Sequence, residues 1–378
     1  MTVFLPPMGI SLAKTYNDDI TQKTVLDAAD KMVEFGLADA GYEYLIIGDA
    51  WCKPTRDENG NLVEDTEKFP DGIKSLSDAL HAKGIKLGIT TSIGVMTPNG
   101  YPGSFEREYA DAETFAKLGV DYIAHTDCDI PAKGGFFTPL RRMNMALRAT
   151  GRDIFYALQF DMDNIQKRMY YTGYEWDGAD LSEYTNGYAV EKWLRSTGVN
   201  SFCTKSAEKP FDAKHDDKFV GYTGTQCWLS LGDIEVENEC CCGLKKAISA
   251  CAVKCSPIII DVDPAKLTDR QVEVMKNAGV IRILKDEESR APAVISANKG
   301  TIYTKLLTDR EYAVLVLNDS DKDEAITFCT FDFGLVYNSG LKCDMYDVFT
   351  NEKHPLFDDA TRIKVKANGS RLFVMKLV

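Results

Sequence analysis

The stretch that decides the fold is Gly119-Val120-Asp121-Tyr122-Ile123-Ala124-His125-Thr126-Asp127-Cys128-Asp129. Its first half is typical of a buried strand, because β-branched and aromatic residues follow a glycine that can end a helix. Its second half turns polar from Thr126 onward. A strand in a (β/α)8 barrel shows this change where it enters the active site, although a strand followed by an ordinary acidic loop shows it too. The interpretation therefore depends on whether the pattern recurs.

The pattern recurs along most of the chain. Segments with helical periodicity lie at 21–35, 73–82, 111–118, 138–149 and 240–254, and apolar segments lie at 42–47, 85–91, 154–158 and 257–260. Weaker signals predict a helix at 190–195 and strands at 199–203 and 220–223. Thr268 and Gln271 form a capping-box pattern at the start of the last helix. About eight strand–helix units favour an α/β fold, a (β/α)8 TIM barrel, over an open sheet.

The pattern changes near Leu284. From Thr301 onward, short apolar or alternating runs are separated by turn sequences, as at 312–317, 325–328, 363–365 and 371–375. Such runs predict a small C-terminal antiparallel β-sandwich. We therefore predict two domains, a barrel over residues 1–285 and a sandwich over residues 286–378.

Composition limits the partners of this chain. The net charge of −13 argues against nucleic acid and anionic membranes, which attract basic surfaces, and favours a neutral small molecule. No basic leader or long apolar run is present, and the eleven cysteines include the run Cys240-Cys241-Cys242, which suits a reducing compartment. We expect a cytoplasmic protein without a metal or cofactor, and a homo-oligomer stays open.

Polar and aromatic residues gather at the predicted strand ends. They are Asp49, Trp51, the residues at 90–92 and 125–129, Asp161, Asp163, and the residues at 195–200 and 226–228, followed by Asp261 and Asp263. Sugar chemistry needs two carboxyl groups on either side of the glycosidic bond and flat apolar surfaces against the ring. The set therefore indicates a carbohydrate or glycoside as substrate, although acidic residues also cap helices and line loops.

Several framework motifs resemble glycoside hydrolase family 27, the melibiase-type α-galactosidases and α-N-acetylgalactosaminidases. They are Pro6-Pro7-Met8-Gly9, Lys68-Phe69-Pro70-Asp71-Gly72, His81-Ala82-Lys83-Gly84-Ile85, Thr150-Gly151-Arg152-Asp153-Ile154 and Ser256-Pro257-Ile258-Ile259-Ile260. The likeness spans nearly the whole barrel. It implies a barrel with a closing β-domain and a retaining enzyme that uses two aspartates.

The motifs that carry the family's chemistry are altered. The family's nucleophile stands in Lys-Tyr-Asp-Asn-Cys, which reads Ala124-His125-Thr126-Asp127-Cys128 here and places Thr126 at the nucleophile position. The family's acid/base motif reads Leu194-Arg195-Ser196-Thr197-Gly198-Val199, with Val199 in place of the carboxylate. The chain thus resembles a divergent member that lacks both usual catalytic aspartates.

Three interpretations follow from these substitutions. The first is a divergent α-galactosidase-like glycoside hydrolase with a rebuilt set of acidic residues, in which Asp127 is the nucleophile or base and Asp161 or Asp163 is the acid. The second is a catalytically inactive sugar-binding protein. The third is a non-hydrolytic sugar-modifying enzyme that uses His125 and Asp127 as an acid/base pair. The predicted catalytic residues are Asp127, Asp161 and His125, and the predicted substrate-binding residues are Asp49, Trp51, Arg195 and Trp228.

Overall fold

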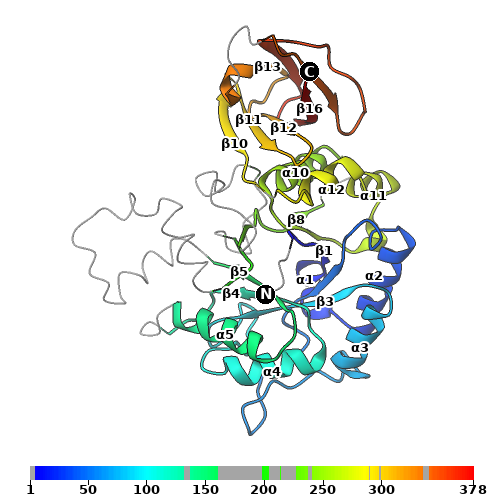
Figure 1. Ribbon diagram of the computed structural model, residues 1–378. Coiled ribbons are helices and arrows are strands. Elements are labelled where there is room, and N and C mark those ends of the chain that lie inside the picture. Colours follow the sequence, from blue (N-terminus) through cyan, green and yellow to red (C-terminus); the bar gives the residue numbers. More distant parts are fainter. Residues whose placement is uncertain are drawn as a thin grey trace, which may run out of the picture.

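The computed structural model describes residues 5–131, 137–160, 198–203, 213, 227–236, 241–288, 290–297, 299–334 and 340–378. Its centre is a parallel sheet, several strands of which are labelled in Figure 1. The sheet has nine strands in the order β7-β6-β5-β4-β3-β2-β1-β9-β8. The strands are β1 (Met8–Ser11), β2 (Tyr44–Ile47), β3 (Lys86–Ser92), β4 (Tyr122–Thr126), β5 (Phe155–Gln159), β6 (Ser201–Cys203), β7 (Trp228–Leu229), β8 (Ile234–Glu235) and β9 (Ile258–Asp261).

The sheet closes on itself through its seventh strand. The two outermost strands in the order, β7 and β8, are pieces of one segment and are joined directly by residues 230–233. β7 pairs with β6, and β8 pairs with β9, both in the parallel sense. The result is an eight-stranded barrel with one broken strand, which confirms the predicted (β/α)8 fold.

Helices cover the outside of the barrel. They are α2 (Gln22–Glu34), α3 (Gly72–His81), α4 (Glu108–Leu118), α5 (Phe137–Ala149), α10 (Cys241–Lys254), α11 (Asp269–Met275) and α12 (Ala278–Leu284). The short helix α1 (Ala13–Tyr16) follows β1 at the carboxyl ends of the strands. The predicted capping box at the start of α11 is confirmed, since Thr268 Oγ1 accepts from the Gln271 backbone and Gln271 Oε1 accepts from the Thr268 backbone. The helix predicted at 190–195 and the strand predicted at 220–223 lie outside the described residues.

Alternation of side chains along the strands divides the barrel into two apolar regions. Tyr44, Tyr122, Phe155 and Trp228 belong to a small cluster inside the barrel. Their neighbours in the chain belong to the large core cluster between strands and helices, as Ile123 does on β4. On β4, Tyr122, Ala124 and Thr126 therefore face inward, and Ile123 and His125 face the helices.

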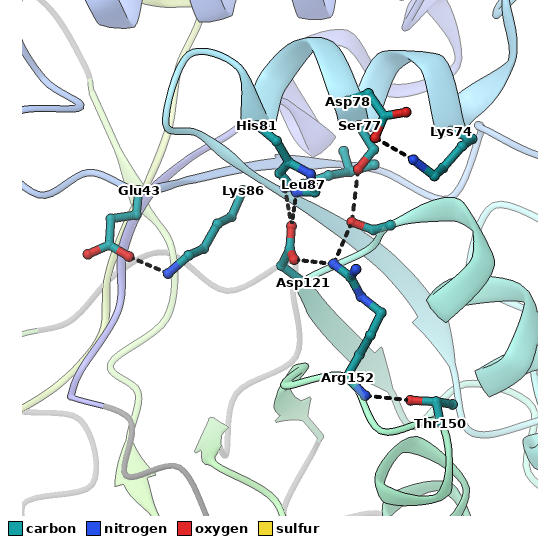
Figure 2. A network of polar contacts seen from close by, with 11 residues as sticks. Glu43, Lys74, Ser77, Asp78, His81, Lys86, Leu87, Asp121, Thr150 and Arg152 are labelled. Atoms are coloured by element: carbon teal, nitrogen blue, oxygen red, sulfur yellow. Dashed lines mark hydrogen bonds and ion pairs between the residues drawn. The ribbon is translucent and has the colours of Figure 1, made fainter.

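A polar network anchors the amino ends of β3, β4 and β5 (Figure 2). The Asp121 carboxylate, at the start of β4, accepts hydrogen bonds from His81 Nε2 at 2.7 Å and from Arg152 Nη2 at 2.6 Å. It also accepts from the backbone N–H of Leu87 on β3, at 3.1 Å. This network lies at the amino ends of the strands. Residues at this end of a barrel stabilise the fold, whereas catalytic residues lie at the carboxyl ends.

Two antiparallel sheets follow the barrel. One has five strands in the order β10-β11-β12-β16-β14, and the other pairs β13 with β15. The strands are β10 (Ala293–Ala297), β11 (Gly300–Leu306), β12 (Glu311–Asn318), β13 (Glu324–Cys329), β14 (Cys343–Asp347), β15 (Ala360–Val365) and β16 (Ser370–Leu377). A separate apolar cluster joins the two sheets, so the C-terminal region is a β-sandwich as predicted.

The central strands of the five-stranded sheet are buried on both faces. Val314 and Val316 of β12 point into the sandwich, while Leu315 and Leu317 join the core cluster of the barrel through α10. α12 ends at Leu284 and β10 begins at Ala293, and the predicted division at 285/286 stays a prediction. No helix in the described ranges combines the length and the apolar character needed to cross a bilayer.

Candidate functional site

A cavity of about 380 Å³ opens at the carboxyl ends of the barrel strands. Polar side chains from several strands line it, among them Ser11, Asp49, Thr126, Gln159, Asp233 and Glu235. These residues end or follow β1, β2, β4 and β5, or belong to the seventh strand. The volume lies within the range of small-molecule sites, and the carboxyl ends of the strands are where barrel enzymes perform their chemistry.

The broken seventh strand brings an extra acidic residue to this cavity. Leu229, Leu231 and Ile234 face the outer core, whereas Ser230, Gly232, Asp233 and Glu235 line the cavity. The inward side of the strand therefore shifts by one residue between Gly232 and Asp233. Gly232 has a φ of +91°, the left-handed conformation that a glycine bulge requires. This bulge places Asp233 at the mouth in addition to Glu235.

Asp233 holds its proton unusually strongly. Burial raises the pKa of its carboxyl group to about 7, and the negative charges of Asp261 and Glu235 act in the same direction, against the opposing charge of Lys14. None of the described residues donates a hydrogen bond to this carboxyl group. A large fraction of Asp233 is therefore protonated near neutral pH, as a proton donor must be.

The other acidic residues of the seventh and eighth strands have partners. Lys14 Nζ and Glu235 Oε1 form an ion pair at 2.6 Å at the edge of the cavity. Asp261, at the end of β9, accepts hydrogen bonds from Ser11 Oγ at 2.7 Å and from the backbone and hydroxyl of Thr15 at 3.0 and 2.8 Å. Asp261 therefore holds α1 against the barrel, and α1 places Lys14 beside Glu235.

Asp49 lies on another wall of the cavity, directly after β2. Asn99 Nδ2 donates to Asp49 Oδ1 at 3.0 Å and to Asn17 Oδ1 at 3.2 Å. This one amide thus joins the chain after β2, the loop after β3 and the segment after α1. Asp49 is only 6% exposed, and its carboxylate is held at the cavity. The contact with substrate predicted for Asp49 stays a prediction.

His125 does not reach the cavity. Its ring lies on the outer face of β4, fully buried, with Nδ1 3.0 Å from the Tyr156 hydroxyl and Nε2 without a partner in the described structure. Burial lowers the pKa of this imidazole to about 3. This position does not fit the active-site role predicted for His125. Side chains alternate along β4, so the neighbouring Thr126 faces the cavity and His125 faces the helices.

Trp51 and Trp228, the two tryptophans predicted to bind substrate, also lie away from the cavity. Trp51 is 2% exposed and packs edge-on against Phe115 of α4, with ring centroids 6.4 Å apart. Trp228 was expected at the end of the seventh strand, but the strand begins there, so its ring fills the barrel interior. Neither ring is among the residues that line the cavity.

The remaining predicted site residues are placed as follows. Asp127 is half-buried after β4 and is not one of the described residues that line the cavity. Asp161 and Arg195 lie outside the described residues. Thr126, which the resemblance puts at the nucleophile position, does line the cavity, and Val199, at the acid/base position, is buried in the outer core. The roles of Asp127, Asp161 and Arg195 stay predictions.

Sequence reasoning missed Asp233, Glu235 and Lys14. The signal that could have found the first two is the run Leu229-Ser230-Leu231-Gly232-Asp233-Ile234-Glu235, an alternating apolar segment that ends in acidic residues. That run lies after the position where the strand end was predicted. No local sequence pattern indicates that Lys14 lies at the cavity, because its ion pair there is with Glu235, which is far away in the sequence.

Closed parallel barrels with an acidic cavity at the strand ends form a class that includes many sugar-processing enzymes. Residues 9–286 match the family model described as "Alpha galactosidase A". The chain therefore belongs to this family, glycoside hydrolase family 27, and the resemblance noted in its framework motifs is confirmed.

Individual relatives agree with this assignment. The chain is 28% identical to an alpha-galactosidase of Cyamopsis tetragonoloba, over 98% of this chain and 86% of the relative. Its fold matches the crystal structure of alpha-galactosidase I from Mortierella vinacea, with a TM-score of 0.84, 23% identity, and coverage of 98% of this chain and 96% of that one. It also matches an alpha-galactosidase from Saccharomyces cerevisiae solved with raffinose, with a TM-score of 0.81, 23% identity, and coverage of 99% and 98%.

Proposed function

We propose that this chain hydrolyses a glycoside in the cavity at the barrel mouth, using a rebuilt set of carboxyl groups. The observation that carries the proposal is that Asp49 and Asp233 line the same cavity from different sides of the barrel. Glycoside hydrolysis needs one carboxyl group on each side of the bond that breaks. The family of this chain and the names of its relatives support the reaction class.

The strand order separates these two carboxyl groups. Asp49 follows β2 and Asp233 precedes β8, with β1 and β9 between them. Three strand spacings of about 4.8 Å each lie along this arc of the barrel wall. The two groups therefore approach a sugar in the mouth from different directions rather than side by side.

Thr126 changes the mechanism that the family suggests. A retaining glycosidase forms a covalent bond between the sugar and a carboxylate nucleophile. The cavity-lining side chain at that position is a hydroxyl, whose oxygen donates to the Thr91 carbonyl at 3.3 Å. We therefore propose direct attack by water, in which one carboxyl group acts as acid and another as base, with inversion at the anomeric carbon.

The test is sugar release from a panel of aryl glycosides that contains the α-galactoside, the α-N-acetylgalactosaminide and the β-L-arabinopyranoside. We expect one sugar to be released and the reaction followed by NMR to give the inverted anomer first. Release with retention would contradict the proposed attack by water while leaving hydrolysis intact. Calorimetric binding of the free sugars without release from any glycoside would favour the sugar-binding alternative.

A further inference from the structure

We infer that Asp233 is the general acid of this reaction and donates its proton to the glycosidic oxygen of the leaving group. The inference rests on the proposed function and assigns a catalytic role within it. Three features of the structure support it: the bulge, the absence of a structural partner, and the charges around the carboxyl group.

The bulge gives Asp233 its position. A regular strand would alternate from Gly232 inward to Asp233 outward, and would place residue 233 against the helices. Gly232, with its φ of +91°, adds one residue to the strand and turns Asp233 to the cavity. Bulges beside active sites often re-aim one side chain in this way.

The second feature is that Asp233 has no hydrogen-bond or ion-pair partner among the residues that the structure describes. Its neighbours in the acidic group are occupied: Asp261 holds α1, Asp263 accepts from the Tyr16 hydroxyl at 2.9 Å, and Glu235 pairs with Lys14. Within the described ranges, Asp233 caps no helix and forms no ion pair. Asp233 is half-buried and faces the cavity, so its carboxyl group can form a hydrogen bond with a ligand there.

The third feature is electrostatic. The charges of Asp261 and Glu235 disfavour a third negative charge at residue 233, while Lys14 offsets part of this repulsion. Asp261 is fixed by its hydrogen bonds to Ser11 and Thr15 and so stays close to Asp233. Burial of the carboxyl group is the largest cause, and together with these charges it raises the pKa of Asp233 to about 7, a value that suits a general acid near neutral pH.

The proposed step balances as follows. The Asp233 carboxyl group gives its proton to the glycosidic oxygen while the bond from that oxygen to the anomeric carbon breaks, and the bonding electron pair moves to the oxygen. Water forms the new bond to the anomeric carbon, and Asp49 accepts the proton that this water loses. Asp49 releases that proton to solvent, from which Asp233 regains one. The products are the free sugar and an alcohol.

Leaving-group dependence tests the role of Asp233. A 2,4-dinitrophenyl glycoside needs no protonation to leave, whereas a 4-methoxyphenyl glycoside of the same sugar does. With the sugar that the wild-type panel identifies, we expect Asp233→Asn to lower kcat/KM by about 10²–10⁴-fold for the 4-methoxyphenyl substrate. The rate on the 2,4-dinitrophenyl substrate stays within a few fold of wild type and shows that the variant is folded.

The pH profile gives a second readout. For wild type, kcat/KM on the 4-methoxyphenyl substrate falls as pH rises through about 7, because the acid loses its proton. This alkaline limb is absent in Asp233→Asn. Asp269→Asn, a change of the same kind at an exposed residue of α11, retains both the wild-type rates and the limb.

The outcomes separate the two proposals. Equal losses on both substrates, or no loss on either, would overturn the role of Asp233 while hydrolysis stands. Failure of the wild type to release any sugar overturns hydrolysis itself and the role of Asp233 with it.

Discussion

At the scale of single residues, the clearest stability determinant is Asp121 at the amino end of β4 (Figure 2). Its side chain is 13% exposed and bonds to His81, Arg152 and the Leu87 backbone. We expect Asp121→Ala to lower the free energy of unfolding by about 3 kcal/mol, measured by urea denaturation, because it leaves these donors without an acceptor. The loss of a partner from a fully buried ion pair costs about 3–5 kcal/mol, and we expect the lower value here because the side chains of His81 and Arg152 are 33% and 37% exposed.

Asp78 supplies the control for this substitution. It pairs with Lys74 one turn away on α3, and both side chains are largely exposed, at 60% and 54% (Figure 2). Exposed pairs of this kind contribute little, so Asp78→Ala changes the free energy of unfolding by less than about 0.5 kcal/mol. Similar losses in the two variants would show that Asp121 does not anchor the strands.

The carboxyl group of Asp233 affects stability through its titration. Its folded pKa of about 7 lies above the ordinary value of 3.8, so the folded state binds more protons than the unfolded state between these values. Its contribution to the free energy of unfolding is therefore largest below about pH 4 and declines as pH rises toward 7. Asparagine does not titrate. We expect the stability of Asp233→Asn relative to wild type to rise across this window.

Urea denaturation at several pH values across that window measures the effect. The exposed change Asp269→Asn is the control, and its stability should follow that of wild type at a constant offset. A constant offset for Asp233→Asn as well would contradict the raised pKa. This outcome is independent of catalysis, so it tests the electrostatics of the site even before a substrate is known.

At the scale of elements, the turn from α4 into β4 depends on Gly119. Its φ is +80°, and a Cβ there would lie 2.5 Å from Ser77 Oγ, which donates to the Gly119 carbonyl at 2.9 Å. Gly119→Ala therefore combines left-handed strain with a steric clash. We expect a loss of about 2–4 kcal/mol in the free energy of unfolding, measured by urea denaturation.

Gly84 separates these two contributions. It ends the turn between α3 and β3 with a φ of +74°, but a Cβ there would meet no atom within 4 Å. Gly84→Ala therefore carries the strain alone, about 1–2 kcal/mol. Equal losses in Gly119→Ala and Gly84→Ala would show that the contact of the new Cβ with Ser77 costs no stability. The requirement for glycine at residue 119 would then come from its backbone conformation and not from close packing of α3.

The elements also show which parts of the fold the sequence predicts. Segments such as 73–82 and 154–158 were predicted because their signals are local, namely an apolar period and a glycine at the end. The seventh strand was not, because its end was predicted at 226–228, before the alternating run at 229–235, and the shift of that alternation at Gly232 gives no local sequence signal for the inward direction of Asp233. The side of the sheet on which His125 lies could not be predicted from the sequence either. A shift of one residue in the alignment of β4 moves every side chain to the opposite face.

At the scale of the whole molecule, the barrel and the C-terminal sheets share one apolar core. Leu315 and Leu317 of β12 belong to the same cluster as Ile248 of α10, which lies between the barrel and the sheets in Figure 1. Burial of apolar surface across the junction couples the two parts energetically. We therefore expect the whole chain to unfold in a single cooperative transition.

Lys305 of β11 reinforces this junction. Its side chain is fully buried, and Nζ donates to the carbonyl of Ala252 near the end of α10 at 3.3 Å and to that of Ile283 near the end of α12 at 2.5 Å. A cation at two helix C-termini satisfies carbonyl groups that have no partner within their own helices. Lys305 therefore links the last helices of the barrel to the first sheet of the C-terminal region.

Replacement of Lys305 by methionine tests this link, because methionine has similar length and removes only the charge and the donors. We expect Lys305→Met to lower the free energy of unfolding by about 3 kcal/mol while the transition stays single, since the shared apolar core remains. Lys299→Met is the control: this lysine is 52% exposed in its ion pair with Glu324, and the change should cost less than about 1 kcal/mol. Two separate transitions in Lys305→Met, followed by urea denaturation with fluorescence and circular dichroism, would show that the buried lysine rather than the apolar core couples barrel and sheets.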